Sequence, residues 1–260
     1  MDLVIGTKLS GGGRGARDSI NSVGLSRKHL VEGMRASLDR LGLEYVDLIF
    51  CHRRDPRTPM VEVVRGMNHL IDEGLAFHWG TSEWTAQEIE EAKGIAKEGG
   101  PLLAPPQFEQ ASHSMLLRER VEMEYRRLYP EMGLTAYAPL QGGRLTGRRR
   151  RGAEEDHLRV SEGLGPIAER LGCSVAQLAV AWCLTNPNVS SCIMGASRLE
   201  QAVDNLGACR VARQLEAEGG AAVLAEVRAV SASILLPLLK SFGCGRLRSC
   251  WAMPLRSREG

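Results

Sequence analysis

Short apolar runs alternate along this chain with longer segments of helical periodicity, and no other feature restricts its fold as strongly. The runs have the length of strands, and the segments between them place apolar residues on one helical face. Strands separated by helices of this size predict βαβ units and a parallel sheet. The predicted strands cover residues 4–8, 46–50, 77–80, 107–110, 134–138 and 190–194.

Capping patterns mark where two of the predicted helices begin. Thr85 is followed three residues later by Glu88, and Ser174 is followed three residues later by Gln177. A hydroxyl residue followed at this spacing by Glu or Gln is typical of a capping box at a helix N-terminus. A further helix is predicted around residues 121–129.

Polar or small residues stand where the predicted strands end. In a (β/α) barrel the C-terminal ends of the strands meet at one face and build the active site. With 260 residues, 43% of them hydrophobic, the chain is long enough for one such domain with a single large core. The residues at the strand ends are Lys8, His52, Ser82, Gln110, Tyr137, Gly195 and Ser197.

Bulk composition excludes several classes of protein. A net charge of +2 gives no strong field for nucleic acid or a membrane surface. The basic run Arg148 to Arg151 is the exception, and such a run also fits a solvated loop. Seven dispersed cysteines without a Cys-x-x-Cys pair predict neither a disulfide framework nor a metal site, and a reducing cytosol is the simpler setting. No apolar stretch approaches the roughly 20 residues needed to cross a bilayer, and no signal peptide is predicted.

Several longer segments carry a resemblance to a known family. The chain resembles the aldo-keto reductases, and within them the branch of voltage-gated potassium channel β subunits, especially the plant-type ones. The resemblance covers roughly residues 2–230 and implies the (β/α)8 TIM barrel of that family. The segments that carry it are GLSRKHLVEGMRASLDRLGLEYVD, TPMVEVVRGMNHLIDEG, WGTSEW, PIAERLGCSVAQLAVAWCL and NPNVSSCIMGAS.

The chain departs from the family pattern at its start and after Arg148, and the resemblance stops beyond about Val230. Six strands are predicted where a barrel of this type has eight, because the first two βα units, which carry an Asp and a Tyr of the catalytic tetrad, have no counterpart. The long connection after Arg148, which holds an Arg for the cofactor 2′-phosphate, is also missing. We expect residues 1–230 to form a partial aldo-keto reductase domain and residues 231–260 a poorly ordered extension, with a docked C-terminal element as the alternative.

Two residues match the rest of the tetrad. The resemblance assigns Lys8 as the tetrad lysine and His52 as the histidine that orients the substrate carbonyl. Burial at the end of a strand would lower the pKa of Lys8 and let it polarise a neighbouring phenol. Without the resemblance, Lys8 also fits a strand-end lysine that extends its ammonium to solvent. The other five histidines match no family role and are expected to be surface or structural residues.

The resemblance also assigns the residues that would hold NADPH. Ser82 and Gln110 match the groups that bind the nicotinamide carboxamide, and Tyr137 matches the aromatic residue stacked on the ring. Ser197 with Glu200 also fits a plain capping box. The remaining positions match contacts to the phosphates and the adenosine: Pro139, Leu140, Gly142, Arg148, Gly195, Ser197, Arg198, Gln201, Asp204 and Asn205.

Three functions stay open at this stage. The first is an NADPH-dependent, cytoplasmic oxidoreductase that reduces small aldehydes or ketones. The second is a redox-sensing regulatory β subunit of a voltage-gated potassium channel, with little or no catalysis. Its expected partners are the channel α subunit and further copies of the chain in a homotetramer. The third is an incomplete, inactive fragment. Because the tetrad Tyr and Asp are lacking, we expect the 260-residue chain to show almost no carbonyl reductase turnover.

Overall fold

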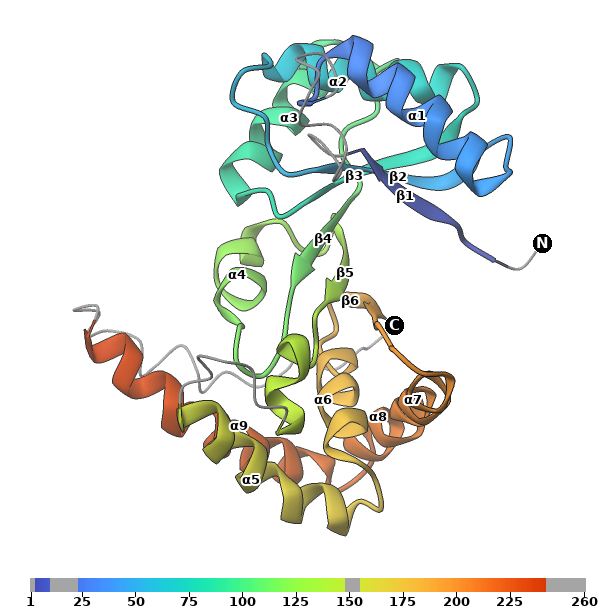
Figure 1. Cartoon of the computed structure of the whole chain (residues 1–260). Helices are drawn as coiled ribbons and strands as arrows, with labels where there is room; N and C mark the ends of the chain where they lie inside the picture. The colour runs from blue at the N-terminus through green and yellow to red at the C-terminus, as the bar shows by residue number, and fades with distance from the viewer. Residues whose placement is uncertain (1–2, 10–22, 148–154, 242–260) are drawn as a thin grey trace. The chain divides into compact units, whose positions relative to one another are not determined.

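The computed structural model describes residues 3–9, 23–147 and 155–241 of the chain (Figure 1). The chain divides into two compact units, which are described separately. Unit 1 consists of Met1–Ala111 and Glu124–Gly133, and unit 2 of Ser112–Met123 and Leu134–Gly260.

Unit 1 is built of parallel strands with helices in the connections. Strand β1 pairs with β2, β2 with β3, and β3 with β4, all parallel. Figure 1 shows its three long helices on one side of β1, β2 and β3. The elements are β1 (Gly6–Leu9), α1 (Arg27–Leu41), β2 (Val46–His52), α2 (Met60–Asp72), β3 (Ala76–Ser82), α3 (Ala86–Glu98), β4 (Phe108–Ser112) and the 3-10 helix η3 (Glu124–Arg127).

Buried apolar side chains join the helices and strands of unit 1. Apolar residues at helical spacing on α1 and α2 are fully buried, as are apolar residues of β2 and β3. Burial of each such side chain contributes about 1.5–3 kcal/mol of hydrophobic free energy, which holds the layer together. These core residues include Leu30, Met34, Val63, Val64, Met67, Leu70, Ile49 and Trp79.

Unit 2 holds the remaining strands and most of the remaining helices. Strand β5 pairs with β6 in parallel. The elements are α4 (Glu119–Glu122), β5 (Gly133–Tyr137), the 3-10 helix η4 (Gln141–Thr146), α5 (Glu155–Arg170), α6 (Val175–Leu184), β6 (Val189–Ile193), α7 (Leu199–Leu206), α8 (Ala208–Glu216) and α9 (Gly220–Ser241).

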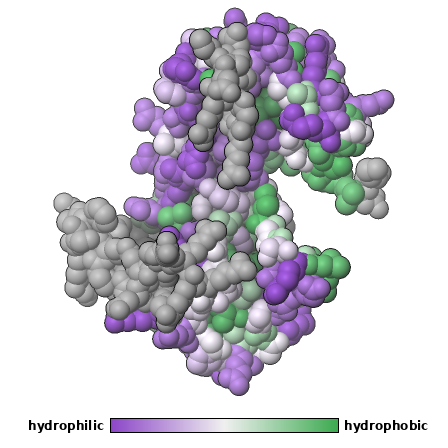
Figure 2. All heavy atoms as spheres, in the orientation of Figure 1, coloured by the Kyte–Doolittle hydropathy of each residue, from purple (hydrophilic) through white to green (hydrophobic). Residues whose placement is uncertain are grey.

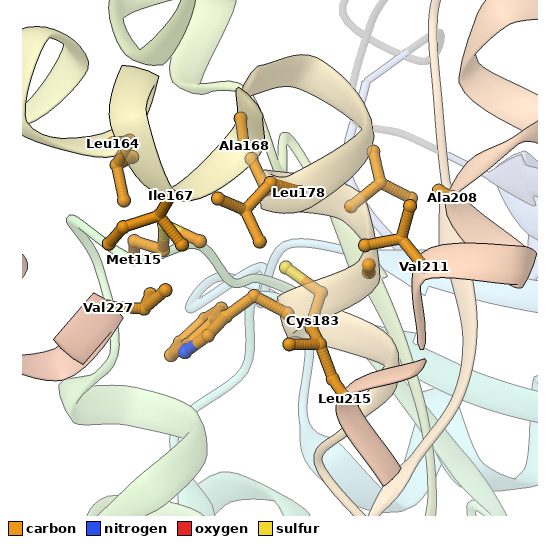
Figure 3. Packing of buried hydrophobic residues seen from close by; sticks show 14 of the residues in the cluster. Met115, Leu164, Ile167, Ala168, Leu178, Cys183, Ala208, Val211, Leu215 and Val227 are labelled. Atoms are coloured by element: carbon orange, nitrogen blue, oxygen red, sulfur yellow. The ribbon is translucent and has the colours of Figure 1, made fainter. Parts of the chain in front are cut away.

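Helix α6 lies at the centre of the core of unit 2. Its residues Leu178 to Cys183 are all buried, so this helix is apolar on every side, as expected of a helix enclosed by others. Figure 3 shows Leu178 and Cys183 of α6 among Ile167, Val211 and Leu215, which come from α5 and α8. This core positions strand β6, which directly follows α6 in the chain.

The six predicted strands are confirmed, with ends that differ by at most two residues. Both predicted capping boxes form: Thr85 and Glu88 exchange hydrogen bonds at the start of α3, and Ser174 and Gln177 do so at the start of α6. Among the described residues no single helix is long and apolar enough to cross a membrane. One pair bent by 87°, Arg159–Arg170 with Val175–Leu184, passes that test by length and composition alone.

The predicted helix at residues 121–129 is wrong as a single element. The segment forms a short α4 and then the 3-10 helix η3. Tertiary hydrogen bonds account for the tight second turn, because the Glu124 carboxylate accepts the Ala86 N–H and the Tyr125 hydroxyl donates to the Trp84 carbonyl. These bonds hold η3 against the start of α3. They favour a 3-10 turn here over the continuous α-helix that the apolar periodicity predicted.

Helix α9 continues past Val230 to Ser241. The predicted change from domain to extension at Val230 therefore falls inside a helix. Residues 242–260 lie outside the described part of the chain, so the expected disorder of the extension stays a prediction.

Large apolar side chains also reach the surface in small groups, as the apolar patches in Figure 2 illustrate. In unit 2 three of them follow one another at helical spacing on α7, with 61–75% of each residue exposed. In unit 1 two lie in the segment that leads into β1. These residues are Leu199, Val203 and Leu206 on α7, and Leu3 and Val4 before β1.

Candidate functional site

The ends of three neighbouring strands in unit 1 are in register. His52 of β2 pairs with Ser82 of β3, and Ser82 pairs with Gln110 of β4. Lys8 of β1 pairs with Phe50, two residues before His52. Since side chains of paired residues lie on the same face and alternate along each strand, all of these side chains share one face of the sheet.

Lys8 is held on this face by a direct contact. Its Nζ donates a hydrogen bond to the side-chain oxygen of Gln110, and it lies 5.8 Å from the centroid of the Phe50 ring. Lys8 is more than a third exposed, yet partial burial of its ammonium lowers the pKa of Lys8. The predicted direction of this pKa shift is therefore confirmed.

A glycine lets two aromatic rings meet beneath Lys8. Phe50 of β2 and Phe108 of β4 make an edge contact with their centroids 4.8 Å apart, although β3 lies between them. Gly80 of β3 occupies the intervening position, and a Cβ there would lie 2.1 Å from the Phe108 ring. Only glycine leaves room for this aromatic contact, which forms an apolar support under the Lys8 side chain.

The surroundings of His52 favour its neutral form at physiological pH. Burial lowers the pKa of His52, and the charges of Lys8 and Arg53 lower it further, while Glu83 acts in the opposite direction. A neutral imidazole keeps one N–H to donate and one nitrogen to accept. The arrangement thus offers a hydrogen-bond donor beside a cation.

Ser82 and Gln110 form a buried pair at the next two strand ends. The Ser82 hydroxyl donates to the backbone carbonyl of Gln110 at 3.0 Å, and the backbone N–H of Glu83 donates to the same carbonyl at 3.1 Å. Both Ser82 and Gln110 are buried, at 1% and 4% exposure. A hydroxyl that donates inward keeps its lone pairs for an N–H donor such as a carboxamide.

The backbone is strained directly after three of the predicted site residues. Arg53, Glu83 and Ala138 have φ of 38°, 62° and 55°, a region that residues with a side chain rarely adopt. They follow His52, Ser82 and Tyr137, respectively. Strain of this kind clusters at functional sites, where the surrounding fold holds it in place. No pattern in the sequence reveals a left-handed arginine, glutamate or alanine, so this feature could not be predicted.

Sequence reasoning also missed Glu109, a carboxylate that is only 1% exposed. It accepts hydrogen bonds from the Thr81 hydroxyl and from the N–H of Glu83. Through the second bond Glu109 holds the strained residue that follows Ser82. The available signal was an acidic residue directly before Gln110, inside a predicted strand.

In unit 2, a loop rich in left-handed residues follows Tyr137. Tyr137, Pro139 and Leu140 are partly or fully buried. Gln141, Gly142 and Gly143 then have φ of 48°, 66° and 93°. Segments that mix right- and left-handed residues form the backbone concavities that bind anions in other proteins. The chemistry of this loop fits the phosphate contacts assigned to Pro139, Leu140 and Gly142.

The segment between β6 and α7 is exposed. Gly195, Ser197 and Arg198 all face solvent. The Ser197 N–H and hydroxyl both bond the side-chain oxygen of Gln201, at 3.1 and 3.0 Å. The N-cap of α7 is Arg198, without a side-chain cap, so the alternative capping box of Ser197 with Glu200 does not form.

Asp204 has a structural role in unit 2. Its carboxylate accepts hydrogen bonds from the Ser174 hydroxyl at 3.1 Å and from the Gln177 amide at 3.0 Å. These contacts tie α7 to the capping box of α6. Its neighbour Asn205 is buried, at 5% exposure. The adenosine contacts assigned to Asp204 and Asn205 stay predictions.

The remaining predicted positions fall into two groups. Arg148 and His157 lie where the structure describes no side chain. Of the other histidines, His113 is fully buried in unit 2, with its ring 5.0 Å from that of Trp182, and burial and the Arg118 charge lower the pKa of His113 to about 4. Within the described ranges no three His, Cys, Asp or Glu side chains gather as metal ligands.

The chain is similar in sequence to a known family and to two plant proteins. The sequence model described as "Aldo/keto reductase family" matches residues 1–223. A protein of Arabidopsis thaliana, named "Probable voltage-gated potassium channel subunit beta", is 47% identical over 232 residues, which cover 81% of this chain and 69% of the relative. A protein of Oryza sativa subsp. japonica with the same name is 46% identical over 232 residues, with the same coverage.

Proposed function

This chain belongs to the aldo/keto reductase family, with the alternating strands and helices of an incomplete (β/α)8 barrel, and we propose that it binds NADPH and serves the reduction of aldehydes or ketones. The observation that carries the proposal is the contact of Lys8 with Gln110 at strand ends shared with His52 and Ser82. Polar groups gathered at this end of parallel strands are how such barrels form active sites.

The residues of unit 1 have the chemistry to hold a nicotinamide carboxamide and a carbonyl. Ser82 and Gln110 present hydroxyl and amide groups on one face, which suit the two ends of a carboxamide. His52, neutral at physiological pH, can donate a hydrogen bond to a carbonyl oxygen. Lys8 adds positive charge beside that oxygen, where negative charge would develop. Bound NADPH would supply the hydride for the carbonyl carbon.

The residues of unit 2 have the chemistry to hold phosphate groups. The left-handed loop after Tyr137 and the exposed Ser197–Arg198 pair supply backbone N–H groups, a hydroxyl and a cation. The family resemblance assigns these positions to the cofactor phosphates. The basic run that begins at Arg148 would add charge for a 2′-phosphate, which is our reason to prefer NADPH to NADH.

A titration of the protein with each nucleotide tests this proposal. Tryptophan fluorescence would be followed as NADPH or NADH is added, at a low and a high salt concentration. We expect saturable binding of both, with NADPH tighter and its advantage shrinking at high salt, because salt screens contacts of exposed charges with a phosphate. Absence of saturable binding, or equal affinities at both salt concentrations, would contradict it.

A second function is favoured by the names of the two relatives. At 46–47% identity both are named as probable potassium channel β subunits. We infer that this chain associates with a channel α subunit, which would bring it to the cytoplasmic side of a membrane. Co-migration of the purified chain with a detergent-solubilised plant voltage-gated potassium channel would support this role. Separate elution at micromolar concentrations of both would count against it.

A further inference from the structure

Two successive residues of β4 hold the last residues of β3 in place. The Glu109 carboxylate accepts one hydrogen bond from the Thr81 hydroxyl and another from the backbone N–H of Glu83. The backbone carbonyl of Gln110 accepts the Ser82 hydroxyl at 3.0 Å and the same Glu83 N–H at 3.1 Å. The end of β3 is therefore attached to β4 by a buried carboxylate in addition to backbone hydrogen bonds.

Glu83 needs this attachment because its backbone is left-handed. Its φ is 62°, which is unfavourable for a residue with a Cβ. Glu83 turns the chain from the end of β3 towards α3, through Trp84, which is fully buried. A carboxylate that accepts the Glu83 N–H stabilises this turn against relaxation of the backbone to an ordinary conformation.

The turn determines where the Glu83 carboxylate lies. The Glu83 side chain is 12% exposed, and its Oε2 lies 3.8 Å from Nη1 of Arg53. Arg53 is also left-handed, and its backbone N–H donates to the Ser82 carbonyl at 3.0 Å. The Arg53 side chain is 62% exposed, and an ion pair this long and this exposed contributes little by itself. The backbones on either side therefore keep the two side chains together.

These two side chains border His52. Arg53 directly follows His52 in the chain, and Glu83 follows the residue with which His52 is paired across the sheet. Burial is the largest cause that lowers the pKa of His52, the charges of Lys8 and Arg53 lower it further, and the charge of Glu83 raises it. Because the charge that opposes the two cations comes from Glu83, the support of Glu83 also matters to His52.

We propose that Glu109 is a positioning residue of the strand-end site, which acts through Glu83 to hold the pair of Glu83 and Arg53 beside His52. The inference rests on the proposed function for the role of His52, but the hydrogen bonds of Glu109 form without a nucleotide. Removal of this support would let the Glu83 carboxylate move away from the imidazole. The imidazole would then be harder to protonate, because Lys8 and Arg53 would act on it with less opposition.

The pKa of His52 in the nucleotide-free full chain tests this proposal. It is measured from the imidazole resonances in NMR spectra of the folded protein. In Glu109→Ala the pKa of His52 should fall, and in Glu83→Gln it should fall at least as far. Glu109→Gln should stay near the wild type, since its amide oxygen can accept the Glu83 N–H and its amide N–H can donate to the Thr81 hydroxyl.

A double variant shows whether Glu109 acts through Glu83. Adding Glu109→Ala to Glu83→Gln should cause no further fall in the pKa of His52. The matched control is Glu124→Ala, which removes a carboxylate that accepts a backbone N–H at the start of α3 and should leave this pKa unchanged. A loss of stability alone would move none of these titrations, because they report on the folded protein.

Glu109→Asp decides the question if Glu109→Ala does not fold. It keeps a carboxylate but shortens the side chain by one CH2 group, so it cannot form both hydrogen bonds and the pKa of His52 should again fall. An unchanged pKa of His52 in folded Glu109→Ala or Glu109→Asp would overturn the proposal. So would a fall on Glu109→Ala that is equally large when residue 83 is already Gln. NADPH binding is measured separately, and its absence would contradict the proposed function alone.

Discussion

Lys8 influences the charge state of His52 across the two strands that carry them. The positive charge of Lys8 is the second cause that lowers the pKa of His52, after burial. Replacing Lys8 with Met should therefore raise the pKa of His52, but not fully to its ordinary value, because burial remains. The pKa is measured from the imidazole resonances in NMR spectra at a series of pH values.

The matched control for this prediction is Lys28→Met. Lys28 is an exposed lysine of α1 that pairs with Glu32 in the same helix. Its removal should leave the His52 titration in place. If Lys8→Met also leaves the pKa of His52 unchanged, the two side chains are not electrostatically coupled. The proposed arrangement of Lys8 beside His52 would then be wrong.

His113 should make the stability of the protein depend on pH. Burial holds its pKa near 4 in the folded chain, whereas an unfolded histidine has a pKa of about 6.5. The folded form thus resists protonation, so stability is fully present above pH 6.5 and is lost as pH falls towards 4. The shift corresponds to about 3 kcal/mol.

Urea denaturation of the wild type and of His113→Phe between pH 7 and pH 4 measures this effect. The wild type should lose more unfolding free energy over that range than the variant, which lacks the titrating group. His78→Gln, a change at an exposed histidine of β3, is the control. Parallel pH profiles for wild type and His113→Phe would refute the assigned role of burial.

For single residues, the sequence could indicate which polar side chains stand at strand ends, because that follows from the apolar runs before them. It could not indicate the hydrogen-bond partners of these side chains. The contact of Lys8 with Gln110 joins residues far apart in the chain, and the left-handed conformation of Glu83 depends on the bond that it donates to Glu109. Neither is a property of a local segment.

Among the elements, strand β3 depends on a glycine in its interior. Gly80→Ala would place a methyl group 2.1 Å from the Phe108 ring and 2.3 Å from its carbonyl oxygen. The strands would have to shift, at a cost of about 1–3 kcal/mol in unfolding free energy. The aromatic contact beneath Lys8 would be lost with them.

Gly94→Ala is the matched control, since nothing lies within 4 Å of a Cβ added at this position in α3. Alanine is a better helix former than glycine, so this variant should gain about 0.5–1 kcal/mol. Thermal or urea unfolding of both variants decides the point. Equal stability of Gly80→Ala and wild type would show that β3 and β4 are not packed as described.

The helix ends show what local sequence does determine. The capping boxes at Thr85 and Ser174 form as predicted, because each needs only two side chains three residues apart. The helix predicted at residues 121–129 breaks instead, because Glu124 and Tyr125 bond to residues of a distant segment. Local patterns therefore fixed the caps, while tertiary contacts decided the interrupted element.

For the whole molecule, the periodicity correctly predicted six strands, helices between them and parallel pairing. The family resemblance, not the periodicity, supplied the barrel type and the cofactor, and the family itself is confirmed by the match over residues 1–223. Helix α9 was not predicted from the sequence, since its apolar residues follow no clear single face and include a proline.

The central claim is that NADPH binds to the strand-end residues of unit 1. Isothermal titration calorimetry of the wild type, Gln110→Ala and the surface control Lys28→Met measures it most directly. We predict saturable NADPH binding to the wild type and the control, and binding about two- to tenfold weaker to Gln110→Ala, since a hydrogen bond in a buried site is worth about 0.5–1.5 kcal/mol and Gln110 also holds Lys8. Equal NADPH affinities for all three proteins, or no binding to the wild type, would contradict the account.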